Sequence, residues 1–202
     1  MQRRLLKLFV LFLLLLFPTI FGWSYLKNYY NFFISNTAFG ITAKYYDLAI
    51  QKTDTKGKEI IFSIKNATPI RDINGKSHDF AMDISLDMEA VTFNVPLTLS
   101  LLLAIVLGFK MPLKKRWEIF YTGVLLLFML HFFSMLLFSL CTIASIVNTN
   151  LYVHFYLTRH YLAGEMLCAI KDFFINYAAR FEPFLIGVYG WWEVEKKLSF
   201  KR

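Results

Sequence analysis

The distribution of positive charge constrains this chain more than any other feature of its sequence. All the excess positive charge lies in three short segments, 1–7, 110–118 and 193–202, which contribute +3, +3 and +2 to a formal net charge of +8. Each segment adjoins a long apolar run, and the two stretches between the segments each sum to zero. Lysine and arginine gather on the cytoplasmic side of the membrane spans that they orient. The pattern therefore predicts that both ends and one middle loop are cytoplasmic, which requires an even number of crossings.

The uncharged runs between these segments have the length of membrane helices. The chain is 57% hydrophobic and 18% charged, which is far too apolar for a soluble domain of this size. Residues 8–26 form one uncharged run and residues 90–109 form a second. A third run begins at Ile119, and the polar residues Asn148–Asn150 close it near Val147. At about 1.5 Å per residue, each run can cross a hydrocarbon core of roughly 30 Å.

The fourth crossing is the least regular part of the prediction. The tail after Trp192 is predicted to be cytoplasmic, yet only ten uncharged residues precede it, from Pro183 onward. A span over 173–192 would place Arg180 and Glu182 close to the middle of the membrane, where an unpaired charge costs roughly 2.5–3.5 kcal/mol. Pro183 also leaves a backbone carbonyl without its helical partner near Ala179. Such a helix is expected to face the bundle interior, a wet cavity or a partner subunit.

The segment between the first two spans has the pattern of a small β-sheet. Residues 80–89 alternate apolar and polar side chains, as a strand with one buried face does. The β-branched stretch 58–65 predicts a second strand, and 41–52 is a plausible third, preceded by a short amphipathic linker over 28–39. The apolar face of this meander needs a cover, which could be a helix of the same chain, the membrane surface or another protein.

We therefore predict a membrane α-helical fold with four transmembrane helices and a small periplasmic antiparallel β-rich insertion between helices 1 and 2. The predicted segments are the N-terminal cytoplasmic end with the first span (1–26), the β-rich domain (27–89), the second span (90–109), a basic cytoplasmic loop (110–118), the third span (119–147), a periplasmic loop with an amphipathic segment (148–172), a kinked, charged fourth span (173–192) and a cytoplasmic tail (193–202).

Polar residues within the apolar segments are the candidate site. His131 lies near the middle of the third span, and it could pair with Arg180 or Glu182 in the fourth, although nothing in the sequence shows that they touch. His131 could relay a proton, or it could simply hydrogen-bond to a neighbouring helix. A second candidate is one polar helix face, which would form either a binding groove or a solvated surface; its members are Glu165, Asp172, Asn176 and Arg180.

Two cysteines are weak candidates for thiol chemistry. Cys141 or Cys168 could act with His154, Arg159 or His160 as a thiol enzyme at the periplasmic face. The ordinary interpretation is that both cysteines are buried and inert. Two cysteines are too few for a disulfide framework or a zinc site, and no nucleotide-binding, hydrolase or zinc-protease motif is present. We expect no catalytic residue, no cofactor and no metal.

The order of features resembles the small multi-pass membrane proteins encoded alongside exosortases, the bacterial membrane enzymes that sort carboxy-terminally tagged surface proteins. The residues that carry the resemblance are Phe21-Gly22-Trp23, Pro96-Leu97, Leu101–Ala104, Lys114–Trp117, Glu182-Pro183-Phe184 and Trp191-Trp192. The resemblance covers the chain in outline and implies a non-catalytic partner in an envelope protein-processing system of a Gram-negative bacterium. The exosortase enzyme's own set of cysteine, arginine and histidine on successive helices is not reproduced.

Three functions follow from these features as hypotheses. The first is an inner-membrane accessory or scaffold protein for envelope protein export or processing. The others are a membrane-embedded thiol enzyme and a small transporter or proton-coupled membrane subunit. In each case we expect the lipid bilayer and either a membrane protein partner or a second copy of the chain as partners, and no nucleic acid, because the basic residues flank apolar spans.

Overall fold

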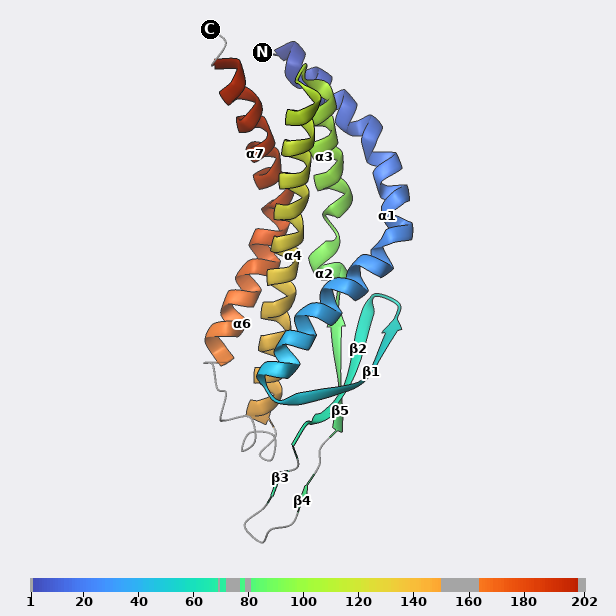
Figure 1. Cartoon of the computed structure of the whole chain (residues 1–202), viewed down its shortest axis with the longest axis vertical. Coiled ribbons are helices and arrows are strands. Elements are labelled where there is room, and N and C mark those ends of the chain that lie inside the picture. The colour runs from blue at the N-terminus through green and yellow to red at the C-terminus, as the bar shows by residue number, and fades with distance from the viewer. Residues whose placement is uncertain (1, 69, 72–76, 79–80, 150–163, 200–202) are drawn as a thin grey trace. The chain divides into compact units, whose positions relative to one another are not determined.

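The computed structural model (Figure 1) describes residues 2–68, 70–71, 77–78, 81–149 and 164–199. The helices are α1 (Gln2–Tyr45), α2 (Glu89–Thr92), α3 (Val95–Gly108), α4 (Leu113–Thr149), α6 (Gly164–Phe173), the π-helical turn η2 (Phe174–Ala178) and α7 (Ala179–Ser199). The strands are β1 (Leu48–Lys56), β2 (Glu59–Asn66), β3 (Ile70–Arg71), β4 (Ser77–His78) and β5 (Ala81–Asp87).

The chain divides into two compact units. The first comprises Met1–Asn28, Thr92–His131 and Tyr177–Arg202, and the second comprises Tyr29–Val91 and Phe132–Asn176. The first unit is helical, whereas the second holds the sheet and the helical segments that pack with it.

Two helices in the described part of the chain are long and apolar enough to cross a membrane by their length and composition. They cover Arg4–Tyr45 in α1 and Leu113–Ser145 in α4. The apolar helix α3 spans only Val95–Gly108, fewer than the roughly 20 residues of a typical bilayer-spanning helix, so the second span predicted over 90–109 is not one continuous helix in the structure. The helix α7 carries charged side chains at several positions, including the buried Glu182.

Small residues let the helices of the first unit approach closely. A Cβ atom added at Gly123 of α4 would lie 2.7 Å from Leu102 Cδ2 of α3, and one added at Gly187 of α7 would lie 2.5 Å from Leu101 Cδ2. Small residues are enriched where membrane helices pack. Figure 1 shows α3 running beside α4 and α7 in this unit. Glycines of α4 and α7 thus leave room for two neighbouring leucines of α3.

Polar side chains also join α1 to α3 within this unit. Pro18 lies inside α1, and the next residue, Thr19, bonds back to the carbonyl of Leu15 at 2.9 Å. The Thr19 hydroxyl also meets the hydroxyl of Ser100, which in turn donates to the Pro96 carbonyl at 2.6 Å. Hydroxyl groups of this kind bridge helices where no water competes for them.

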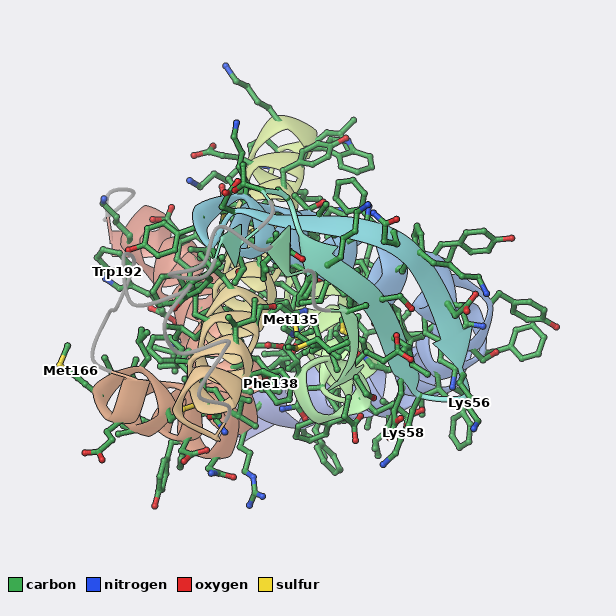
Figure 2. The ribbon with its side chains drawn as sticks, turned by 90° about the horizontal axis from the view of Figure 1, so that it is seen from below. Lys56, Lys58, Met135, Phe138, Met166 and Trp192 are labelled. Atoms are coloured by element: carbon green, nitrogen blue, oxygen red, sulfur yellow. A yellow bond between two sulfur atoms is a disulfide. The ribbon has the colours of Figure 1, made fainter. Side chains whose placement is uncertain are left out.

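The second unit contains a three-stranded antiparallel sheet in the order β1-β2-β5. Ile60, Phe62 and Ile64 of β2 and Ile84 and Leu86 of β5 are buried on one face. This confirms the expected antiparallel β-rich insertion and the two strands predicted over 58–65 and 80–89; Phe80 lies outside the described residues. Figure 2 shows Lys56 and Lys58 at the tip of the β1–β2 hairpin, where Gly57 has a φ of 63°.

The cover of the apolar sheet face is the second half of α1. The Phe39 ring stacks on the Phe62 ring of β2 with 4.1 Å between centroids. Buried side chains recur along α1 at helical spacing; they are Asn31, Ile34, Ser35, Ala38, Phe39, Thr42 and Ala43. The cover is therefore supplied within the chain.

The predicted third strand was placed too early in the sequence. Residues 41–45, read as the start of a strand, continue α1, and β1 begins only at Leu48. The residues expected as a linker, 28–39, are also helical. The physical reason is that burial against the sheet outweighs the weak strand preference of Ile41 and Thr42, because Thr42 and Ala43 lie on the buried face of the helix. Asp47, with a φ of 54°, ends this helical run.

Candidate functional site

A buried polar cluster joins three helices of the first unit. It consists of Asn94 before α3, Thr98 in α3, His131 in α4 and Glu182 in α7, which are 3%, 1%, 1% and 0% exposed. Asn94 and Thr98 are one helical turn apart and so present both side chains on the same side of α3. All four residues stand among apolar neighbours, where unpaired polar groups are costly.

His131 and Glu182 bring α4 and α7 into close polar contact. His131 Nε2 lies 2.7 Å from Glu182 Oε2. The contact is a close polar pair and not a regular hydrogen bond. Two lone pairs would repel at this distance, so at least one proton must reside on the imidazole nitrogen or on the carboxyl oxygen. Of the two partners that we predicted for His131, the structure brings Glu182 to it.

The second oxygen of Glu182 contacts a different helix. The hydroxyl of Thr98 donates to Glu182 Oε1 at 2.8 Å. One carboxyl group therefore connects α7 to α4 through Oε2 and to α3 through Oε1. A buried carboxyl group with partners at both oxygens fixes the rotation of its helix, because turning α7 would separate both contacts at once.

Asn94 supplies the partner that Pro183 removes from its own helix. Pro183 has no N–H, so it cannot bond to the carbonyl of Ala179 one turn earlier. That carbonyl instead accepts a hydrogen bond from the side-chain amide of Asn94. Ala179 is 4% exposed, so the freed carbonyl would otherwise be buried without a partner.

Arg180 lies apart from the cluster. It is exposed, whereas Glu182, two residues and about 200° further round the helix, is buried. Glu165, Asp172 and Asn176 are exposed as well. The polar face expected from these four residues is thus on the surface of the chain. The π-helical turn η2 separates Asp172 from Arg180, and such turns often mark positions with a functional role.

The two cysteines are joined to each other. Cys141 near the end of α4 and Cys168 in α6 form a disulfide within the second unit, with their Cα atoms 4.9 Å apart. The expectation of two separate thiols was therefore wrong, because the fold brings α4 and α6 side by side at these positions. Neither sulfur is a free nucleophile in this form. His154, Arg159 and His160, the residues proposed to assist them, lie outside the described residues.

An ion pair lies at the opposite end of α4 from the disulfide. Lys115 Nζ lies 2.7 Å from Glu193 Oε2 of α7 and 3.0 Å from Glu118 Oε1. The hydrogen bond from Lys115 holds the pKa of Glu193 below its usual range. This pair ties the start of α4 to the last turns of α7 within the first unit.

Asn94 and Thr98 were not among the predicted site residues. The sequence offers one signal for them, which is that a polar amide and a hydroxyl stand one turn apart in the otherwise apolar run 90–109. Their partners cannot be identified from this spacing, because Ala179 and Glu182 follow more than 80 positions later.

A comparison with protein families supports the resemblance noted above. The sequence model of the family described as exosortase H-associated membrane protein matches residues 2–160. No curated protein and no solved structure gave a match.

Proposed function

Because this chain belongs to the family of exosortase H-associated membrane proteins, we propose that it is a non-catalytic accessory or scaffold protein of an exosortase-like system. In this role it would assist the processing of envelope proteins by binding the enzyme in the membrane. The family match carries the proposal, since it extends over most of the chain.

The polar cluster supports a structural role for the helices. Both carboxyl oxygens of Glu182 contact other side chains, and Asn94 contacts the Ala179 carbonyl, so the groups are directed at neighbouring helices. Contacts of this kind set the register and rotation of a helix bundle. A bundle of fixed shape suits a protein that presents a surface to a partner.

As part of this proposal, the chain is a four-span protein of the inner membrane with both ends in the cytoplasm. The three basic segments support the cytoplasmic placement of residues 1–7, 110–118 and 193–202. The Cys141–Cys168 disulfide supports a periplasmic placement of the sheet and of the α4–α6 contact, because disulfides persist in oxidising compartments.

Cysteine accessibility in intact cells tests this topology. Single cysteines would be placed at Ser63 in β2, Lys171 in α6 and Ser199 at the end of α7, in a chain without its native cysteines. We expect Ser63→Cys and Lys171→Cys to react with an impermeant maleimide from outside, and Ser199→Cys to react only after permeabilisation. Reaction of Ser199→Cys from outside would contradict the fourth crossing.

Purification from native membranes tests the accessory role. A tagged chain, extracted in mild detergent after photo-crosslinking, is expected to carry the exosortase of the same cell, and deletion of the chain is expected to leave tagged surface proteins unprocessed. The control is an unrelated tagged membrane protein at equal abundance. Normal processing in the deletion strain, together with no crosslinked membrane protein, would contradict the proposal.

A second candidate function is proton coupling in a membrane complex, which the His131–Glu182 contact favours. An imidazole next to a carboxyl group can take up and release a proton. The test is His131→Gln in cells. If the processing phenotype depends on pH in the wild type and loses that dependence in the variant at unchanged protein level, proton coupling is supported; an unchanged dependence would contradict it.

A further inference from the structure

An apolar groove runs along the surface of the first unit between α1, α3 and α7. Its volume is about 360 Å³, and its lining includes Leu8 and Phe9 of α1, Leu101 and Ile105 of α3, and Val188 and Trp191 of α7. Phe9 and Val188 are 57% and 49% exposed, so the groove opens sideways. In a bilayer, this opening faces the lipid chains.

Cations stand at one end of the groove. Arg4 adjoins the lining residue Leu5, Lys110 follows the end of α3, and both side chains are exposed. Lys7 Nζ donates to the carbonyl of Gly108 at 3.2 Å, but Lys7 lines a separate pocket on another face of α1 and is not part of this groove. Lys196, one turn beyond Trp192 on α7, is exposed as well and lies over the Trp192 ring. Figure 1 shows the N-terminal end of α1 close to the C-terminal end of α3 within this unit.

We propose that this groove binds an anionic phospholipid, with one acyl chain along its apolar lining and the phosphate near Arg4 and Lys110. Basic pockets between membrane helices on the cytoplasmic side bind anionic head groups, and each lysine or arginine near the surface contributes about 1 kcal/mol. The apolar lining matches the acyl chain of such a lipid, and the cations match its phosphate. The inference rests on the membrane topology proposed above, but not on the accessory role.

The charge beside the groove favours a lipid over a helix of a partner protein. An acyl chain is far thinner than a helix, which is about 10 Å across, and can extend along the apolar lining. The exposed cations select an anion, which an apolar partner helix does not supply.

Lipid binding to the purified full-length chain tests the proposal. Native mass spectrometry in detergent would be used to titrate palmitoyl-oleoyl phosphatidylglycerol, the matching phosphatidylcholine and glycerol 3-phosphate. We expect phosphatidylglycerol to bind most tightly and glycerol 3-phosphate not to compete. Arg4→Gln and Lys110→Gln are each expected to weaken phosphatidylglycerol binding about fivefold, as loss of one cation predicts.

Matched variants test whether lipid binding depends on the groove itself and not on any added ring or any lost cation. Val188→Trp fills the groove and leaves the cations intact, and we expect it to abolish the tight binding. Leu125→Trp adds the same ring at a position of α4 that is 59% exposed and outside the groove lining, and we expect it to have no effect. Lys56→Gln removes one exposed cation at the β1–β2 hairpin, at the position labelled in Figure 2, and is also expected to have no effect.

Four results would overturn the proposal. They are equal affinity for the two lipids, equal competition by glycerol 3-phosphate, unchanged binding by a folded Val188→Trp variant, and equal weakening by Lys56→Gln and Arg4→Gln. If Val188→Trp instead releases a co-purifying membrane protein without changing lipid binding, the occupant is a partner helix and the lipid proposal is wrong. If Val188→Trp does not fold, unchanged phosphatidylglycerol binding by Arg4→Gln and Lys110→Gln would overturn the proposal.

Discussion

His131 of α4 and Glu182 of α7 meet inside the helix bundle, with Nε2 and Oε2 2.7 Å apart. Both side chains are almost fully buried, at 1% and 0% exposure. The other oxygen of Glu182 accepts a hydrogen bond from Thr98 of α3. One carboxyl group thus fixes α7 against two other helices, at the point where Pro183 interrupts its backbone bonding.

Removal of the Glu182 carboxyl group should strongly destabilise the bundle. Glu182→Ala leaves His131 and Thr98 buried without this partner, and truncating one member of a buried pair costs about 3–5 kcal/mol. The measurement is the free energy of unfolding in detergent micelles. The control is Glu165→Ala, which removes an exposed carboxylate and should change that energy by less than about 0.5 kcal/mol.

The double variant distinguishes a buried pair from two independent residues. Replacing both His131 and Glu182 by leucine removes both polar groups, and such replacements are often neutral or stabilising. We therefore expect the double variant to be more stable than either His131→Leu or Glu182→Leu alone. Additive losses from the two single changes would show that the residues do not interact.

Asn94→Ala should destabilise the bundle because Pro183 has no N–H to replace the hydrogen bond that Asn94 gives to the Ala179 carbonyl. The Ala179 carbonyl would lose the hydrogen bond from Asn94 and remain buried, at a cost of about 1–3 kcal/mol. The informative comparison is with Pro183→Ala, in which the new backbone N–H can reach the Ala179 carbonyl. In that background, Asn94→Ala should cost clearly less in the same unfolding measurement. An equal cost in both backgrounds would contradict this assignment.

The sequence allowed prediction of the parts of the fold that depend on local periodicity. The strands over 58–65 and 80–89 alternate with a period of two, and the structure has β2 and β5 there. The end of α1 could not be predicted in this way. Residues 41–45 have β-branched members, and their helical state depends on the sheet beneath them, a long-range contact that no local pattern reports.

Of the candidate site, only the titratable residues His131 and Glu182 could be predicted from the sequence. His131 and Glu182 attract attention because titratable groups are rare in apolar segments. Thr98 and Asn94 do not, because a hydroxyl and an amide are common in membrane helices. The disulfide was missed for a related reason, since two cysteines alone do not indicate pairing unless α4 and α6 are known to lie together.

Phe39→Ala should loosen the sheet from its helical cover. The Phe39 ring is 0% exposed and stacks on Phe62, and loss of a buried phenylalanine costs about 3–5 kcal/mol. We expect faster hydrogen exchange of the β1, β2 and β5 amides by mass spectrometry. The matched control is Phe33→Ala on the same helix, where the side chain is 58% exposed. Equal exchange in the two variants would show that α1 does not cover the sheet.

Loss of the Cys141–Cys168 disulfide should destabilise the second unit without abolishing function. The bond closes a loop over a sequence separation of 27, for which chain entropy predicts about 3.5 kcal/mol. The double change Cys141→Ser with Cys168→Ser should lower thermal stability and keep envelope-protein processing, since we propose no thiol chemistry. Loss of processing at normal protein level would favour the thiol enzyme instead.

The same cysteines report the side of the membrane on which they lie. If the α4–α6 contact is periplasmic, the bond should form only where a periplasmic thiol oxidase is active. Membranes from wild-type cells and from cells without that oxidase would be alkylated before and after reduction, and the mass of the chain measured. We expect protection of both cysteines in the wild type and free thiols without the oxidase. Free thiols in both strains would place this contact in a reducing compartment, and that result would invert the orientation that the three basic segments predict.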